Sequence, residues 1–95
     1  MSDPTFLVLA SLAGEDRHGY AMIEDIARFS SIRLGPGTLY GAIARLEERG
    51  WIRPLPGDDR RRPYTLTAAG REEFERRLAG LQAVVRTGAR RLKRV

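Results

Sequence analysis

Residues 51–66 interrupt the helical periodicity that runs through the first fifty residues of the chain. Both ends of this segment read as short strands, and the polar stretch PGDDRRRP between them indicates a hairpin with a long charged tip. Three short helical segments precede the hairpin, and one long amphipathic segment follows it. Three helices followed by a two-stranded hairpin is the order of the winged helix-turn-helix. The pattern therefore predicts a mainly α protein with a small β-hairpin, the wing, in this fold.

The predicted second helix, within residues 19–30, is amphipathic. Helical spacing assigns four residues to its buried side: Tyr20, Ile23, Ile26 and Ala27. Asp25 is expected to face solvent. His18 stands directly before this helix, and a single histidine with no second ligand beside it reads as a cap or a packing residue rather than as a metal ligand or a catalytic base.

Residues 35–50, GPGTLYGAIARLEERG, predict a third helix with one bare side. Its core side is predicted from four residues: Leu39, Ala42, Ile43 and Leu46. The opposite side is centred on four others: Gly37, Gly41, Ala44 and Glu48. A helix in water gains from long charged side chains, whereas a helix in the major groove needs small residues so that its backbone can approach the bases. Glycine lowers the stability of a helix by about 1 kcal/mol relative to alanine, and close approach to DNA would explain why Gly41 is present despite this cost. We therefore include Gly37 and Gly41 in the predicted DNA-binding site.

The side chains that flank the bare side are the predicted DNA contacts. Thr38 and Arg45 are expected to touch bases or phosphates. Tyr40 could contact a phosphate through its hydroxyl or could be a partly buried packing residue. Glu48, near the centre of the bare side, could accept a hydrogen bond from a cytosine amino group or could lie beyond the end of the groove contact.

The hairpin tip carries three successive arginines, Arg60, Arg61 and Arg62, beside Asp58 and Asp59. An arginine on a wing can reach a phosphate or the narrow minor groove, where the negative potential is enhanced. The same residues could instead form a solvated turn with weak local ion pairs. We predict that one or two of the three arginines contact DNA, without assigning which.

Arginine dominates the charge of the chain. The formal net charge is +5, the isoelectric point is about 10.7, and every basic residue except Lys93 is arginine. The planar guanidinium suits phosphates and guanine edges, which favours a polyanionic partner. A GC-rich coding genome would give the same composition, so the positions of the arginines must decide.

The chain lacks residues that several other functions need. It has no cysteine, which leaves no disulfide or thiolate metal site and fits a reducing cytoplasm. Its apolar runs are far shorter than the roughly 20 residues of a membrane span, and no side chains have the spacing of a nucleophile and its base. We therefore expect a cytoplasmic protein that is not an enzyme, uses no cofactor or metal, and does not enter a membrane.

The segment after residue 66 predicts one long helix that begins at the N-cap Thr67. The residues along one side recur at spacings of four and three, which is typical of a coiled-coil seam: Phe74, Leu78, Leu81, Val85, Gly88 and Leu92. We expect this seam, with Phe6 and Leu9 of the first helix, to join two subunits, although it could instead fold back on the first helix of its own chain. Residues 1–66 are then the winged helix-turn-helix DNA-binding domain, and residues 67–95 are the C-terminal dimerisation helix.

Three blocks of sequence together resemble the PadR family of bacterial winged-helix transcriptional regulators. They are HGYAMIEDI at residues 18–26, PGTLYGAIARLEERGWI at 36–52 and RRRPYTLTAAGREEF at 60–74. The resemblance implies a homodimeric repressor of double-stranded DNA with a pseudo-palindromic operator. It implies that the helix with the GTLY block reads the major groove, that the wing contacts the backbone or minor groove, and that the C-terminal helix joins the subunits. Gly41 stands where many members have proline.

The resemblance also extends to regulation. One predicted helix follows the hairpin. In this the chain resembles the short members of the family, which lack an extra helical C-terminal domain. In some members a small hydrophobic effector binds near the dimer interface, and such an effector is a candidate partner here. The alternative function is a winged-helix protein interaction module whose basic surface is incidental. Loss of any preference for operator over random duplex would favour that alternative.

Overall fold

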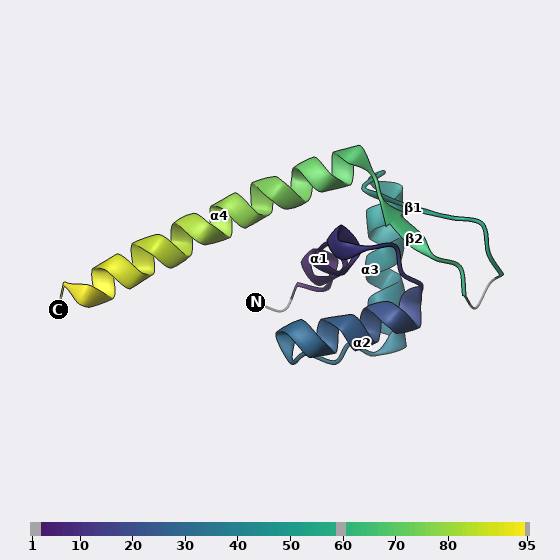
Figure 1. Cartoon of the computed structure of the whole chain (residues 1–95), viewed down its shortest axis with the longest axis horizontal. Coiled ribbons are helices and arrows are strands. Elements are labelled where there is room, and N and C mark those ends of the chain that lie inside the picture. Colours follow the sequence, from purple (N-terminus) through teal and green to yellow (C-terminus); the bar gives the residue numbers. More distant parts are fainter. Residues whose placement is uncertain (1–2, 59–60, 95) are drawn as a thin grey trace.

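The computed structural model describes residues 3–58 and 61–94, which form four helices and a two-stranded hairpin (Figure 1). In chain order the elements are α1 (Pro4–Gly14), α2 (Gly19–Ser30), α3 (Pro36–Glu48), β1 (Ile52–Pro54), β2 (Tyr64–Leu66) and α4 (Ala68–Lys93). This order confirms the prediction of three helices, a hairpin and a long final helix. None of the helices in the described ranges is both long enough and apolar enough to cross a membrane.

Side-chain caps fix where three of the helices begin. Asp3 Oδ1 accepts a hydrogen bond from an amide of the first turn of α1 at 3.0 Å, and Thr67 Oγ1 accepts one from the Gly70 amide at 3.0 Å. His18 Nδ1 accepts a hydrogen bond from the Ala21 amide at 3.3 Å, which confirms that His18 is a cap. These bonds satisfy amides that have no partner within the first turn of a helix.

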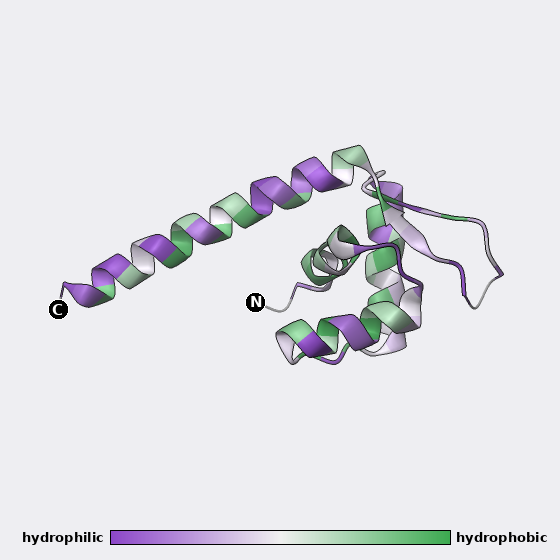
Figure 2. Cartoon of the chain, in the orientation of Figure 1, coloured by the Kyte–Doolittle hydropathy of each residue, from purple (hydrophilic) through white to green (hydrophobic). Residues whose placement is uncertain are grey.

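The core forms around α1, which is apolar on most of its sides. α1 packs against α2, α3, α4 and β2, and its buried apolar residues are Leu7, Val8, Leu9 and Leu12. The remaining core residues come from α2, the following turn, α3 and β1: Met22, Ile23, Ile26, Leu34, Leu39, Ala42, Ile43, Leu46 and Ile52. Figure 2 shows α1 as a largely hydrophobic helix between its neighbours.

The inner side of α2 differs from the prediction. Ile23 and Ile26 are buried as expected, but Tyr20 is 67% exposed and Met22 is fully buried. Met22 therefore faces the core in place of Tyr20, and the prediction that Tyr20 is buried was wrong. The reason is that Tyr20 lies in the first turn of α2, where it lines an open pocket with Pro36 at the start of α3 instead of facing α1.

Asp25 is also not where the sequence predicts it. Its side chain is only 19% exposed, and Asp25 Oδ2 accepts a hydrogen bond from the Ser11 hydroxyl at 2.8 Å and lies 3.5 Å from Arg17 Nε. Ser11 is buried within α1, and a buried hydroxyl requires a hydrogen-bond partner. The solvent-facing prediction was wrong because this partner comes from a different helix.

The hairpin is antiparallel and is anchored to the loop before α2. Ile52 pairs with Leu66, and Pro54 pairs with Tyr64. The Arg17 amide donates to the Tyr64 carbonyl at 3.3 Å, and the Tyr64 amide donates to the Arg17 carbonyl at 2.9 Å. Through this bridge, Arg17 ties β2 to the loop between α1 and α2.

The first half of α4 packs on the rest of the protein, and its second half projects away from it (Figure 1). Gly70 is buried against the main chain of Trp51, and the rings of Phe6 and Phe74 have centroids 5.4 Å apart. The projecting half gives the chain its longest dimension, 55 Å. A helix that leaves the core in this way carries apolar side chains that its own protomer does not cover.

Candidate nucleic-acid interface

The two sides of α3 are as the sequence predicts. All four residues of the predicted core side are buried: Leu39, Ala42, Ile43 and Leu46. On the other side, Gly37, Thr38, Ala44, Arg45 and Glu48 are exposed, and Gly41 is half-buried. The exposed side of α3 therefore has a backbone that carries few large side chains.

The glycines of this side are not required by packing within the protomer. A Cβ atom added at Gly37 would meet nothing within 4 Å, and one added at Gly41 would meet only Arg45 Nη1, at 3.6 Å. Glycine inside a helix is less stable than alanine by about 0.5–1 kcal/mol. Since nothing inside the molecule compensates for this cost, the small residues point to a function outside the protomer.

Tyr40 lies where α3 meets α2. A Cβ atom at Gly19 would be 2.7 Å from Tyr40 Cζ, so the tyrosine ring rests directly on the first residue of α2. Tyr40 is nevertheless 42% exposed. The side chain thus packs against α2 and still presents surface to solvent. The packing role is confirmed, and contact with a phosphate stays a prediction.

The hairpin extends to one side of α3, away from the projecting half of α4 (Figure 1). Arg61 and Arg62 are exposed, and the Arg61 amide donates to Asp58 Oδ1 at 2.9 Å, which fixes the turn. Arg60 lies outside the described residues. Nearer the base of the hairpin, burial raises the pKa of Tyr64, and the carboxylate of Glu47 raises it further, so its hydroxyl stays a neutral donor.

Beside α3 lies a cluster of residues that the sequence does not indicate as a site. This cluster lines one concave pocket of about 210 Å³. Its charged residues are Arg45 and Arg49 at the end of α3, Arg77 of α4, and Asp3 before α1. The only sequence signal for it is the spacing of four between Arg45 and Arg49, which puts two like charges on one side of a helix. The other two residues join them only through the tertiary fold.

The apolar seam of α4 is largely exposed. Leu78, Val85 and Leu92 are 36%, 67% and 78% exposed, and Val84, which the seam pattern omits, is 67% exposed. Figure 2 shows these hydrophobic positions continuing along the projecting half of α4. The alternative in which the whole seam folds back on α1 does not describe this chain, because only the first half of α4 reaches α1 (Figure 1).

Three predicted dimer residues are partly enclosed within the protomer, and one is fully enclosed. Phe6, Phe74 and Leu81 are half-buried where α1 meets α4. Leu9 is completely buried in the core, so its side chain cannot reach a second subunit. Its assignment to an interface was wrong because α1 is covered on the Leu9 side by the other helices of its own chain.

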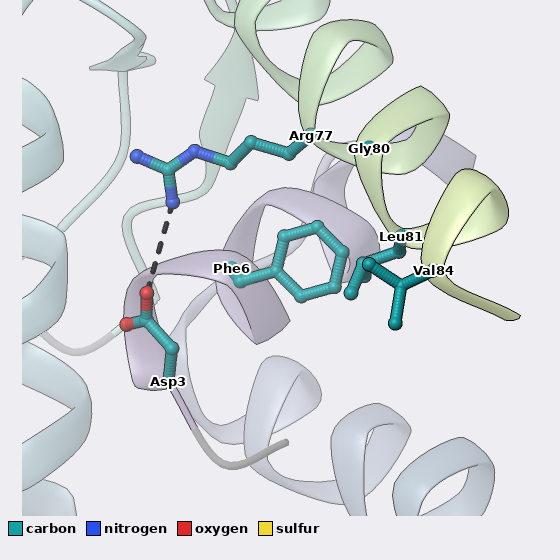
Figure 3. A pocket seen from close by; sticks show the side chains of 6 residues that line it. All are labelled: Asp3, Phe6, Arg77, Gly80, Leu81 and Val84. Atoms are coloured by element: carbon teal, nitrogen blue, oxygen red, sulfur yellow. Dashed lines mark ion pairs between the residues drawn. The ribbon is translucent and has the colours of Figure 1, made fainter. Parts of the chain in front are cut away.

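An apolar pocket of about 260 Å³ lies between the start of α1 and α4 (Figure 3). Phe6, Leu81 and Val84 form its apolar wall, and Gly80 leaves one side open. Arg77 closes the other end with an ion pair of 3.7 Å to Asp3. Arg76 and Arg77 also donate hydrogen bonds to Glu73, which hold the pKa of that carboxyl below its ordinary value.

These features define a class of protein. A helix with a bare outer side, a second helix packed against its first turns, and a hairpin directly after it make a winged helix-turn-helix. Residues 8–76 match the transcriptional regulator PadR-like family, and the chain belongs to that family. Within the described ranges, no three His, Asp or Glu side chains are placed together to hold a metal ion.

Known proteins resemble the chain in sequence and in fold. An uncharacterized 37.1 kDa protein in transposon TN4556 of Streptomyces fradiae is 52% identical over 75 residues, which are 79% of this chain but only 22% of that relative. A PadR family transcription regulator from hypervirulent Clostridium difficile R20291 superposes with a TM-score of 0.84, at 23% identity over 96% of this chain and 99% of its own.

Two further solved structures share the fold. A transcriptional regulator from Clostridium thermocellum has a TM-score of 0.77 and 25% identity, and the match covers 88% of this chain and 84% of that one. F93 from STIV, a winged-helix DNA-binding protein, has a TM-score of 0.76 and 23% identity, with 84% and 88% of the two chains covered. The fold is thus that of winged-helix proteins of similar length.

Proposed function

We propose that the protein is a cytoplasmic, homodimeric transcriptional repressor that binds a pseudo-palindromic operator. The observation that carries this proposal is the bare side of α3. A Cβ atom at Gly37 would meet nothing within 4 Å and one at Gly41 would meet only Arg45 Nη1, although both glycines weaken the helix. A helix of this kind can lie deep in the major groove, which is about 12 Å wide. Membership of the PadR-like family supports the same function.

In this proposal each part of the interface has its own role. Thr38 and Arg45, exposed on the flank of α3, contact bases or phosphates, and the exposed part of Tyr40 contacts a phosphate. One or two arginines of the set Arg60, Arg61 and Arg62 reach the backbone or minor groove from the hairpin. Repression follows when the bound dimer occupies promoter DNA.

The alternative, a protein interaction module, has less support. The centres of protein interfaces are enriched in large aromatic and apolar anchors that fill pockets. The exposed side of α3 offers mainly glycine, alanine and threonine, Tyr40 is its one large ring, and Arg45 and Glu48 are its charged side chains. This surface is small and polar, which suits a groove better than it suits a protein partner.

Operator binding should be strongly dependent on salt. If the dimer neutralises about six phosphates, affinity for its own promoter DNA should fall on the order of 1,000-fold between 50 and 200 mM salt, because counterions are released. Gel shifts across a salt series, with random duplex of equal length as the control, measure this. Affinity that does not change with salt concentration, or that is equal for promoter DNA and random duplex, would support the interaction module instead.

We further propose that α4, within residues 67–95, joins the two subunits through its exposed seam. A Cβ atom added at Gly80 or at Gly88 of α4 would meet nothing within 4 Å, so a second helix can approach closely on this side. Val84 lies midway between them and lines both apolar pockets of α4. The dimer would then set its two α3 helices about 34–36 Å apart, one turn of DNA.

Replacing Val84 by glutamate should break the dimer without unfolding the protomer. Val84 is 67% exposed, so the protomer loses little packing, whereas a dimer would bury an unpaired carboxylate. Sedimentation velocity measures the mass, and Ala79→Glu, at an exposed position of α4 outside both pockets, is the matched control. An unchanged dimer in Val84→Glu would remove the side of α4 that carries Val84 from the interface.

The same experiment bears on a hydrophobic effector. The apolar pocket in Figure 3 lies under the proposed seam, which is where such a ligand would bind. A hydrophobic fluorescent dye that binds the dimer should therefore lose its site in Val84→Glu and keep it in Ala79→Glu. A dye that binds both variants equally would place any effector site elsewhere.

A further inference from the structure

The pocket beside α3 has an unusual lining. Five of its six lining residues are polar or charged, and they come from three separate parts of the fold: Asp3, Thr5, Arg45, Leu46, Arg49 and Arg77. Its volume of about 210 Å³ is far larger than the 10–15 Å³ that one water molecule needs. The pocket can therefore hold a polyatomic group rather than a single water.

The charges of this lining do not cancel. Three guanidinium groups and one carboxylate line the pocket. Arg77 is already paired with Asp3 and also donates to Glu73 at 2.7 Å, so Arg45 and Arg49 carry the uncompensated positive charge. Asp3 is already engaged, because its Oδ1 accepts from the Thr5 amide and hydroxyl and its Oδ2 pairs with Arg77 at 3.7 Å. Among the described residues, no carboxylate lies within ion-pair distance of Arg45 or Arg49.

Helix electrostatics do not explain both arginines. A cation near the C-terminus of a helix is stabilised by the macrodipole, and Arg49, the C-cap of α3, fits that explanation. Arg45 lies one turn earlier on the same flank, and two like charges four residues apart repel each other by about 0.2–0.5 kcal/mol. An anion between the two guanidinium groups would remove this repulsion.

We infer that this pocket binds a phosphate group. Guanidinium groups from two helices converge on one concavity, and the arginine fork matches phosphate oxygens in bidentate geometry. Thr5 adds a hydroxyl to the same lining. The phosphate can belong to the operator backbone, in which case the inference rests on the proposed function, or to a free phosphorylated small molecule.

An optical reporter, Trp51, lies beside the pocket and contacts two of its arginines. The guanidinium carbon of Arg49 lies 5.1 Å from the ring centroid of Trp51, and that of Arg77 lies 5.3 Å from it. Trp51 is the only tryptophan of the chain. An anion that draws either guanidinium group into the pocket will change a cation–π contact and therefore the emission of Trp51.

Inorganic phosphate is the probe for the free protein, titrated at constant ionic strength against chloride while Trp51 emission is followed. We expect a saturable change, with an affinity at least about tenfold weaker in Arg45→Gln, because one charge-assisted contact is lost. Arg45→Gln leaves both cation–π contacts of Trp51 in place, so the reporter survives. Arg86→Gln, an equal charge change at an exposed position of α4 outside the pocket, should titrate like the original protein.

Operator DNA is the probe for the second source. Arg49→Gln should lower the slope of log affinity against log salt by about 0.9, the value for one phosphate, and Arg86→Gln should not. A phosphate response without this slope change assigns the pocket to a free phosphorylated ligand, whereas the slope change, with or without the response, assigns it to the operator backbone. If variants that melt normally show neither effect, the inference is overturned. If the protein shows no operator preference, the proposed function fails, and the phosphate titration still tests whether the pocket binds phosphate.

Discussion

Replacing Gly70 by alanine is expected to lower the free energy of unfolding by about 3 kcal/mol, the upper part of the range for overpacking a core. A Cβ atom at Gly70 would lie 2.8 Å from the carbonyl carbon of Trp51 and closer still to its oxygen. That carbonyl cannot easily retreat, because it accepts the Thr67 amide at 3.0 Å at the start of α4. Urea denaturation followed by circular dichroism measures the loss.

The control for this prediction is an alanine at a glycine with open space. Gly41→Ala should raise the free energy of unfolding by up to about 1 kcal/mol, since it improves helix propensity and meets only the tip of Arg45. If Gly70→Ala proved as stable as the original protein, α4 would not be seated on Trp51 as the structure shows. The two variants together separate the cost of a clash from the intrinsic preference of a helix for alanine.

Much of this fold can be predicted from local signals. The caps His18 and Thr67 and the buried side of α3 depend on residues within a few positions of one another, and all of them are confirmed. The hairpin follows from the change of period at Trp51 and is confirmed in its pairing. Local sequence is enough to predict an element when the residues that stabilise it lie within the same segment.

The errors occur where the partner lies in another element. Asp25 reads as a surface charge until Ser11 of α1 lies beside it. Leu9 reads as part of an outward apolar side until the other helices cover it. A single helix shows which residues share a side, but the neighbours decide which side is covered.

The same limit applies to the candidate site. The bare side of α3 could be predicted because small residues are visible at helical spacing. The phosphate pocket could not, since Asp3, Arg45 and Arg77 are far apart in the chain and meet only through the packing of α1, α3 and α4.

Gly41→Leu should abolish specific operator binding while leaving the protein at least as stable. A Cβ atom at this position would meet only Arg45 Nη1, the end of a flexible side chain, and leucine favours a helix over glycine by most of 1 kcal/mol. In the major groove the same side chain would hold the helix away from the bases and remove the contacts of Thr38 and Arg45 together. Specific affinity should then fall toward the non-specific level, on the order of 1,000-fold.

Fluorescence anisotropy with labelled operator and random duplex measures this change, and thermal melting measures stability in the same samples. Ala79→Leu places an equal side chain on an exposed position of α4 outside both apolar pockets, and should leave operator affinity within about twofold, or 0.4 kcal/mol. Gly41→Leu that bound operator normally would show that α3 does not enter the groove by this side. Because the variant is expected to be more stable, a loss of binding could not be attributed to unfolding, and the glycine would then be explained by the approach of DNA.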